Sequence, residues 1–317
     1  MKKELSLGID TSNYKTSVAV VDAEGTILFN HQQFLQVKQG ERGLRQSEAL
    51  FQHVQNLPPV MEKVLQNEKF RSNIGIVAVS VRPRPKEGSY MPVFTAGAGY
   101  GRAVAAALGV SLHEVSHQEG HVEAVRFYSA MKDVEPLICF HFSGGTTEAL
   151  LVDRSRFEIV GGSRDLAYGQ VLDRIGVSMG LPFPCGETMD QIAWETRKMH
   201  LNPSQHLTRI KVTDGYVNLS GIETQGQRLL ASCADSELVA DLFEKLSRSV
   251  AEMTMQLSEK YKISNFLYAG GVSCSRYLRE YLSHHLCGDL NISFGSSQLS
   301  SDNAVGVALL GGKEIWH

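Results

Sequence analysis

The chain has 317 residues, of which 43% are hydrophobic and 21% charged, and its formal net charge at pH 7 is −3. These values describe an ordinary soluble globular protein, long enough for one large domain or two of average size. They exclude a broad basic surface, so a nucleic acid would have to be held by a local basic patch or with the help of a partner.

Two stretches of the sequence share one order of predicted elements. In residues 5–30 and again in residues 137–162, an apolar strand is followed by a small polar loop, a second strand, a tight turn and a third strand. Mainly helical sequence follows each stretch. The repetition predicts two lobes of related topology with a boundary near residues 129–136, rather than a short-period solenoid. The predicted strands are 5–10, 16–22, 26–30, 137–142, 148–153 and 157–162.

The loops between the first two strands of each stretch, "DTSNYKTS" and "SGGTTE", are rich in hydroxyl groups, glycine and exposed amides. Such a loop can present N–H groups to a phosphate, and glycine lets the backbone approach it closely. Either loop alone could equally be a plain hairpin turn. Because the two loops occupy matching places, they favour a nucleotide clamp.

Two other glycine-containing segments differ in what they indicate. "GAGYGR" (97–102) does not have the GxGxxG spacing of a dinucleotide-binding turn, so a Rossmann site is not expected there. In "FLYAGGVSCSRYLREYL" (266–282), an apolar strand stops at Gly270-Gly271 and an amphipathic helix is expected from near Ser273. Paired glycines in that place would let a flat ligand such as a purine pack on the backbone, although a simple helix-start turn has the same pattern.

The stretch "SHQEGH" places His117 and His121 four residues apart. Ser116 and Glu119 have the spacing of a capping box, so we expect a helix over 116–128 with both histidines on one face. This spacing suits two imidazoles that bind one metal ion. A zinc protease of the HExxH type needs glutamate directly after the first histidine, and this chain has glutamine there, so a metalloprotease is disfavoured.

A metal site would need at least one further ligand, and the C-terminal stretch offers a candidate. "SSDNAVGVALLGG" places Ser301 or Asp302 at the start of a helix of small residues, 302–312. A carboxylate there could simply cap the helix, since the helix dipole favours it, or it could bind a cation. Two histidines and one aspartate suit iron or zinc.

Six short motifs together resemble one family. "GIDTS", "SHQEGHVEA", "FSGGTTEALLV", "DLAYGQVLDRIGVSMGLPFPCGETMDQIA", "YAGGVSCSRYLRE" and "SSDNAVGVALLGG" occur in the order and approximate spacing of the tRNA threonylcarbamoyladenosine transferase (glycoprotease) family. The resemblance covers nearly the whole chain. It implies an α/β fold of the actin/Hsp70/sugar-kinase type (ASKHA), with two lobes of related topology around a nucleotide cleft. The expected lobes are 1–132 and 133–317, with the last helix packing back on the first lobe.

The resemblance also implies a metal site and candidate catalytic residues. The residues that match the family's ligands for one divalent metal ion, iron or zinc, are His117, His121 and Asp302. The candidate catalytic residues, in and behind "GIDTS", are Asp10, Ser12 and Lys15. For Lys15, the expectation rests on its place in the loop, where its charge could assist with a phosphate.

A second set of matches implies a site for ATP, AMP or an acyl-adenylate. The segment 141–145 matches the loop that contacts phosphates, and Asp173 is expected near the sugar. Gly186 and Asp190 match residues at the adenosine end, while Ser275 replaces an asparagine and has a shorter reach. The candidate cofactor-binding residues are His141, Phe142, Ser143, Gly144, Gly145, Asp173, Gly186, Asp190, Gly271 and Ser275.

The sequence departs from the family at positions where chemistry is expected. Asn13-Tyr14-Lys15 stands where the family has Cys-Asp-Glu, and Thr146 replaces a histidine. "RPRPKEGSYMP" (82–92) replaces a glycine-rich loop. This basic, proline-rich segment could touch RNA, a partner or an anionic substrate, or it could be a stiff exposed loop. Leu166 and Gln170 also replace acidic residues.

Three functions therefore stay open. The chain could move a threonylcarbamoyl group from its adenylate to N6 of the adenosine next to the tRNA anticodon, with partner subunits. It could instead be a divergent nucleotide-binding regulatory module, or another ATP-dependent transferase or kinase of this fold. The five scattered cysteines without a CxxC pair favour reduced thiols. No signal peptide or membrane-spanning stretch is visible, so we expect a cytoplasmic protein with no membrane partner.

Overall fold

The computed structural model describes two compact units. The described residues are 3–12, 14–36, 44–154, 156–199, 205–286, 288, 290–296, 299 and 304–316. One unit is formed by residues 1–128 together with 298–317, and the other by residues 129–297. The C-terminal segment thus groups with the N-terminal unit. The division between the units falls after residue 128, whereas the sequence predicted it near residue 132.

The first unit is built on a five-stranded sheet with the order β3-β2-β1-β4-β5. β1, β2 and β3 pair antiparallel, whereas β4 and β5 run parallel to β1. The first three strands form where the alternating apolar sequence predicts them. Their bounds are Leu5–Thr11 for β1, Lys15–Val21 for β2, Ile27–Phe34 for β3, Ile74–Arg82 for β4 and Ser111–Ser116 for β5.

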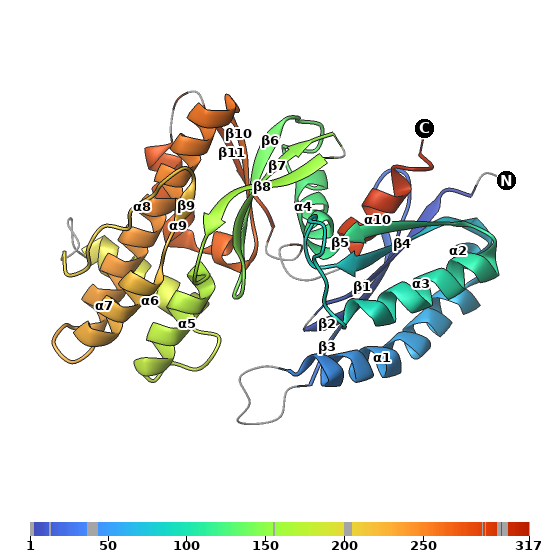
Figure 1. Cartoon of the computed structure of the whole chain (residues 1–317), viewed down its shortest axis with the longest axis horizontal. Coiled ribbons are helices and arrows are strands. Elements are labelled where there is room, and N and C mark those ends of the chain that lie inside the picture. Colours follow the sequence, from blue (N-terminus) through green and yellow to red (C-terminus); the bar gives the residue numbers. More distant parts are fainter. Residues whose placement is uncertain are drawn as a thin grey trace. The chain divides into compact units, whose positions relative to one another are not determined.

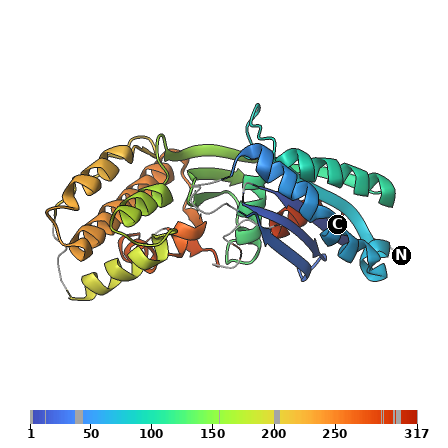
Figure 2. The ribbon, with the colours of Figure 1, turned by 90° about the horizontal axis from the view of Figure 1, so that it is seen from below.

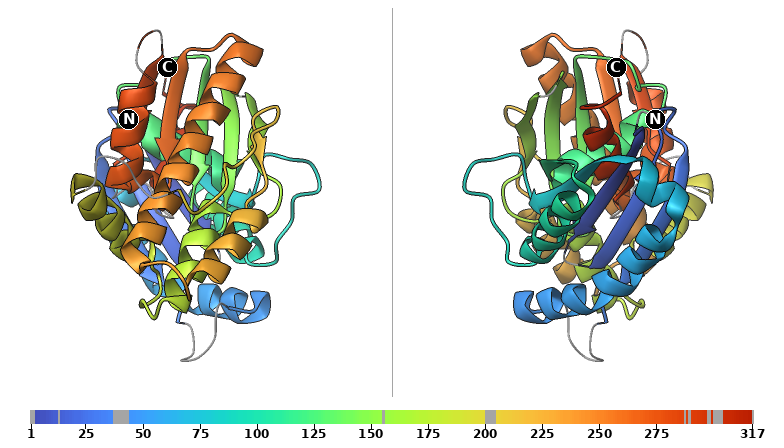
Figure 3. Two further views of the ribbon diagram at one scale, coloured as in Figure 1. Left: turned by 90° about the vertical axis from the view of Figure 1, so that its left-hand side faces the viewer. Right: turned by 90° about the vertical axis from the view of Figure 1, so that its right-hand side faces the viewer.

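Helices cover both faces of this sheet because successive side chains of a strand point to opposite faces. On β2, Val18 and Val20 pack in one apolar cluster with α1 and α3, while Ala19 and Val21 pack in another with α10. Figure 3 shows α1 across the first strands, and Figure 1 shows α10 beside α4. The helices are α1 (Gln46–Gln66), α2 (Glu68–Asn73), α3 (Phe94–Leu108), α4 (His117–Phe127) and α10 (Val305–Gly312).

The second unit has a six-stranded sheet with the order β11-β10-β6-β7-β8-β9. Here β6, β7 and β8 pair antiparallel, and β10 and β11 run parallel to β6, so five strands repeat the order of the first unit. The predicted likeness of the two halves is therefore present in the sheets. The bounds are Leu137–Phe142, Thr147–Asp153, Arg156–Ser163, Tyr216–Val217, Asn265–Ala269 and Asn291–Phe294 for β6 to β11.

Helices pack on this second sheet, as Figure 2 shows, and the core of this unit contains stacked aromatic side chains. Phe140 stacks on Phe142 and Tyr268, with ring centroids 5.3 Å apart in each pair. A 3-10 helix (Gly271–Cys274) follows β10, so the α-helix predicted from near residue 273 begins three residues later. The α-helices are α5 (Tyr168–Ser178), α6 (Gly186–Met199), α7 (Ser220–Leu229), α8 (Asp235–Tyr261) and α9 (Arg276–His285).

The cysteines and the helix composition complete the description. Cys139, Cys185, Cys233 and Cys274 are free thiols, and Cys287 lies outside the described residues. Within the described part of the chain, no helix combines the length and apolar character needed to cross a membrane.

Candidate functional site

The capping box predicted at the start of α4 is confirmed. The Ser116 hydroxyl accepts the Glu119 amide at 3.2 Å, and the Glu119 carboxylate accepts the Ser116 amide in return. Glu119 also lies 3.8 Å from Arg82 of β4. Its carboxylate is therefore engaged at the helix terminus, so it is not placed to act as the base of a metalloprotease.

The two histidines that follow this cap face one another. The Nε2 atoms of His117 and His121 lie 3.0 Å apart, and their rings meet edge to face. Nitrogen atoms of two imidazoles on one tetrahedral zinc ion would lie about 3.3 to 3.4 Å apart, because the Zn–N bonds are about 2.0 to 2.1 Å long. The two nitrogens are thus about 0.3 Å closer than one divalent metal ion requires, at the distance of a hydrogen bond between the rings, and they would have to move apart by that amount to bind the ion together.

Asp10 fixes the orientation of His117. Oδ1 of Asp10 accepts a hydrogen bond from the Ser80 hydroxyl and lies 2.9 Å from Nδ1 of His117. The carboxylate is fully buried at the end of β1. This contact favours the proton on Nδ1, which leaves the lone pair of Nε2 for a metal ion. Oδ2 of Asp10 is buried with no hydrogen-bond partner among the described residues, and a cation nearby would offset that cost.

The third predicted metal ligand, Asp302, lies outside the described residues. The segment behind it packs closely on the histidine helix. A side chain at Gly306 of α10 would overlap the carbonyl oxygen of Gly120, which lies on α4 between the two histidines. On the other side, a side chain at Gly8 of β1 would meet Ala304 and Ala308. The glycines let β1, α4 and α10 approach backbone to backbone.

A histidine that the sequence did not single out supports the loop after β1. Nε2 of His53 lies 2.7 Å from the carbonyl oxygen of Ser12, and Nδ1 lies 2.8 Å from the Thr16 hydroxyl. His53 is fully buried, and this burial lowers its pKa. The sequence indicates this burial, because His53 lies four residues from Ala49 and four from Leu57 on the apolar face of α1.

Lys15 is held by β3. Its ammonium group donates to Oε1 of Gln32 at 3.1 Å and lies 4.6 Å from the centre of the Phe34 ring. The side chain is buried to 6% exposure. The contribution of Lys15 to phosphate binding stays a prediction.

In the second unit, the loop after β6 is a tight hairpin with exposed glycines. The Ser143 hydroxyl accepts the amides of Gly145 and Thr146 at 3.4 and 3.0 Å. Among the described residues, apart from the immediate chain neighbours, no atom lies within 4 Å of the place that a side chain would take at Gly144 or Gly145. The adjoining start of α5 touches this loop so closely that a side chain at Gly169 would lie 2.6 Å from Cα of Gly144. Open space beside the two exposed glycines is what a backbone contact to phosphate needs.

The turn after β10 lies at the same edge of this sheet. Gly270 has a φ of 91°, and a side chain there would overlap the carbonyl oxygen of Phe142. Since β6 and β10 are parallel neighbours, their carboxyl ends meet, and the hairpin loop and this turn lie close together. Gly271 again has open space at its side-chain position. The side chain of Phe142 is buried in the core, so only its backbone could meet a ligand.

Two carboxylates that were expected to bind the ligand are engaged with the chain itself. Asp173 accepts the Cys185 amide at 2.8 Å, and burial raises the pKa of Asp173. Asp190 accepts the Ser275 hydroxyl and the first amides of α9, from Arg276 at 2.7 Å and Tyr277 at 3.0 Å. Asp190 and Ser275 thus lie together and cap α9, and their contribution to ligand binding stays a prediction.

Comparisons with known proteins agree over nearly the full length of the chain. The sequence profile of the family described as tRNA N6-adenosine threonylcarbamoyltransferase (TsaD) matches residues 27–309. A protein of that name from Streptococcus suis strain 05ZYH33 is 29% identical over 98% of this chain and 92% of its own. One from Archaeoglobus fulgidus is 27% identical over 97% and 90%.

Solved structures with the same fold are more distant in sequence. Component A of the (R)-2-hydroxyglutaryl-CoA dehydratase from Acidaminococcus fermentans has a TM-score of 0.56 at 16% identity and covers 99% of both chains. A ROK family glucokinase from Streptomyces griseus has a TM-score of 0.50 at 15% identity, over 98% of this chain and 99% of its own. Full-length HypF has a TM-score of 0.61 at 11% identity, over 100% of this chain and 48% of its own. The predicted ASKHA fold is confirmed.

Proposed function

The chain belongs to the tRNA N6-adenosine threonylcarbamoyltransferase family, and from this premise we propose that it moves a threonylcarbamoyl group from its adenylate to N6 of the adenosine beside the tRNA anticodon. The observation that carries the proposal is the histidine pair on α4. His117 and His121 bring their Nε2 atoms to 3.0 Å, and buried Asp10 orients the first ring. These residues would hold one divalent ion, iron or zinc, together with Asp302.

The parts of the chain have separate tasks in this proposal. A bound metal ion would polarise the acyl donor. Asp10 keeps a proton on Nδ1 of His117, so that Nε2 stays available as a ligand. Gly144 and Gly145, whose outer sides are open, would place backbone amides against the phosphate of the adenylate. Gly271, also open, would let the flat base lie on the turn after β10.

A basic segment beside α4 supports an RNA substrate. Arg84 and Lys86 are exposed in the loop that follows β4. The loop is anchored to the histidine helix, because the carbonyl oxygen of Pro83 accepts the Gln118 amide at 3.1 Å. Phosphate contacts from such residues position a nucleic acid without reading its sequence. In a chain of net charge −3, a local basic patch is the form that RNA binding would take.

The deciding experiment supplies the purified protein with threonylcarbamoyl-adenylate and unmodified tRNA. The family's partner proteins are added in a second series, and the modified nucleoside is quantified by mass spectrometry after digestion of the tRNA. We expect transfer that depends on metal and is lost in the double variant His117→Ala/His121→Ala. A Tyr128→Phe protein, altered just behind α4, serves as the control that should keep activity.

The same experiment tests the alternatives that the substitutions favour. Tyr14-Lys15 in place of two carboxylates, and Thr146 in place of histidine, remove groups expected near the chemistry. If the protein binds AMP or ATP and metal but modifies no tRNA even with partners present, the transferase proposal is wrong. The chain would then be a nucleotide-binding regulatory module, or a transferase or kinase with another acceptor.

A further inference from the structure

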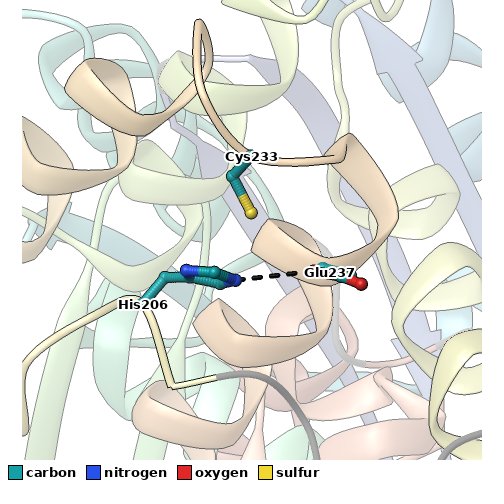
Figure 4. Close-up of side chains that lie close together, drawn as sticks. All are labelled: His206, Cys233 and Glu237. Carbon is teal, nitrogen blue, oxygen red and sulfur yellow. Dashed lines mark hydrogen bonds and ion pairs between the residues drawn. The ribbon is translucent and has the colours of Figure 1, made fainter.

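A second group of side chains of metal-binding types lies in the other unit, at residues to which the sequence assigns no role. His206, Cys233 and Glu237 place one donor atom each within 4.8 Å of one another, as Figure 4 shows. Cys233 lies in the link between α7 and α8, and Glu237 lies in the first turn of α8. Cys233 precedes the N-cap of α8, Ala234, so the link and the first turn of the helix each supply one donor.

The separations suit one small divalent cation. Nε2 of His206 lies 3.4 Å from Oε2 of Glu237. In a tetrahedral zinc site the ligand atoms lie about 3.3 to 3.8 Å apart, because the bonds are about 2.0 to 2.3 Å long. All three donor atoms lie within 4.8 Å of one another, so any pair beyond that range would have to approach to share one ion. Magnesium and calcium prefer oxygen ligands, whereas zinc also binds nitrogen and sulfur. A nitrogen, a sulfur and a carboxylate oxygen together therefore favour zinc.

The backbone that carries the group is held without a metal ion. Oδ2 of Asp241, a fully buried residue of α8, accepts the amides of His206 and Leu207, each at 2.7 Å. The Cys233 amide donates to the carbonyl oxygen of Leu229 at 2.9 Å, at the end of α7. The segment that carries His206 and the link that carries Cys233 are therefore both hydrogen-bonded to neighbouring helices. A fixed backbone reduces the entropy lost when the side chains close on an ion.

The surroundings are negative and open to solvent. The carboxylates of Glu237, Asp241 and Asp235 lie near enough to the Cys233 thiol to act on it electrostatically. The side chains of His206 and Glu237 are 36% and 42% exposed, so an ion can enter from solution. A divalent cation would neutralise this negative field and bind the sulfur as thiolate.

We propose that His206, Cys233 and Glu237 form a zinc site, separate from the histidine pair on α4, with water in the fourth position. A bound ion would cross-link the segment that begins at His206 to the start of α8. The competing explanation is a surface ion pair between His206 and Glu237 with a thiol beside it, since exposed pairs of this kind are common.

Cobalt substitution tests this site selectively. Cobalt(II) bound through a thiolate gives a sulfur-to-metal charge-transfer band in the near ultraviolet, and the histidine and aspartate ligands proposed beside α4 contain no sulfur. We expect the metal-free wild-type protein to show this band on titration with cobalt, and zinc to remove it by displacement. The band should vanish in Cys233→Ser and His206→Ala and persist in Cys274→Ser, the matched thiol control, and in His117→Ala/His121→Ala.

Two results of the cobalt titration would overturn the proposal. One is the absence of a thiolate band in the wild-type protein, and the other is a band of unchanged intensity in Cys233→Ser. Because a substituted protein could fail to fold, a second measurement uses the wild-type chain. Zinc should slow alkylation of Cys233, mapped by mass spectrometry, at least about tenfold relative to Cys274 in the same sample, and equal rates with and without zinc would contradict the site.

Discussion

At the scale of single residues, Asp10 is the residue whose replacement we expect to weaken metal binding through its contact with His117. Replacing it by asparagine keeps the shape but removes the charge that favours a proton on Nδ1 of His117. Loss of a carboxylate that hydrogen-bonds the other ring nitrogen of a metal-binding histidine typically weakens metal binding about 10- to 100-fold. We expect Asp10→Asn to lower zinc or iron affinity by that factor in competition with a chelating dye.

The control for this variant is Asp22→Asn. Asp22 accepts the Thr26 amide at 2.7 Å in the turn after β2 and contacts neither histidine. Its loss should cost some stability and leave metal affinity unchanged. Equal metal affinity for Asp10→Asn and the wild-type protein would show that Asp10 does not orient His117.

The buried His53 predicts a pH dependence of stability. Burial lowers its pKa from the ordinary value of 6.5 in the folded protein. Below that value the unfolded chain binds a proton that the folded chain does not, so the free energy of unfolding falls as the pH falls. In the neutral ring, Nε2 donates to the carbonyl oxygen of Ser12, and Nδ1 accepts from the Thr16 hydroxyl, which itself accepts the side-chain amide of Asn56 at 3.1 Å.

We expect His53→Gln to be less stable at neutral pH and to lose less stability on acidification than the wild-type protein. Urea unfolding on both sides of the ordinary histidine pKa would measure this difference. His284→Gln, at a side chain that is 70% exposed, should follow the wild-type curve. If His53→Gln has the full wild-type slope with pH, another group causes the dependence.

These residues also show where prediction from sequence stops. The spacing of His117 and His121 is local, so a helix and a shared face follow from the sequence alone. The contact of Asp10 with His117 joins positions 107 apart and depends on β1 and β5 entering the same sheet. Asp190 is expected near a ligand, and the structure adds that it caps α9, a role that the sequence does not show because the same amino acids serve as helix caps and as ligand-binding residues.

At the scale of elements, the close approach of α4 and α10 holds the histidine helix in place. A methyl group at Gly306 would overlap the carbonyl oxygen of Gly120, and backbone atoms cannot move aside as a side chain can. Overpacking of this kind costs about 1 to 3 kcal/mol or more. We expect Gly306→Ala to lower the free energy of unfolding by that amount and to weaken metal binding.

Gly99→Ala is the matched control within the same unit. Gly99 is exposed inside α3, and outside the helix's own backbone no atom of the described residues lies within 4 Å of the added carbon. Removing a helical glycine there should stabilise the protein by about 0.5 to 1 kcal/mol. Denaturant unfolding of the two variants checks both signs, and a Gly306→Ala protein as stable as Gly99→Ala would refute the packing explanation.

Helices and turns were predicted correctly from the sequence where a few neighbouring residues determine the local structure. Ser116 and Glu119 predict the start of α4 because a capping box needs only four residues. "GAGYGR" was correctly excluded as a dinucleotide turn, and it lies inside α3, where Gly97 and Gly101 make room for Thr11 and Val79. No local pattern shows which neighbour a helix glycine will face, so that role needed the structure.

At the scale of the whole molecule, the repeated strand order is the feature that the sequence predicted best. Alternating apolar residues locate β1 to β3 and β6 to β8, and the same order of pairing follows in both sheets. The parallel strands β4, β5, β10 and β11 could not be placed, because parallel pairing joins segments separated by long helical connections. For the same reason, sequence position alone does not assign residues 298–317 to the first unit.

The division into two units predicts that metal binding and nucleotide binding can be separated by mutation. The histidine pair lies in the first unit, and the open glycines 144, 145 and 271 lie in the second. Gly271→Val should fill the space expected for a base and weaken AMP or ATP binding at least about tenfold, while metal content stays at the wild-type value. In calorimetric titrations, His121→Ala should lose metal binding and keep nucleotide binding. Either change alone should abolish transfer, because the reaction needs both the metal ion and the nucleotide.

Gly221→Val, at an exposed position on α7 that also has open space among the described residues, is the control for the added side chain. If Gly271→Val binds nucleotide as tightly as the control, the turn after β10 is not part of the nucleotide site.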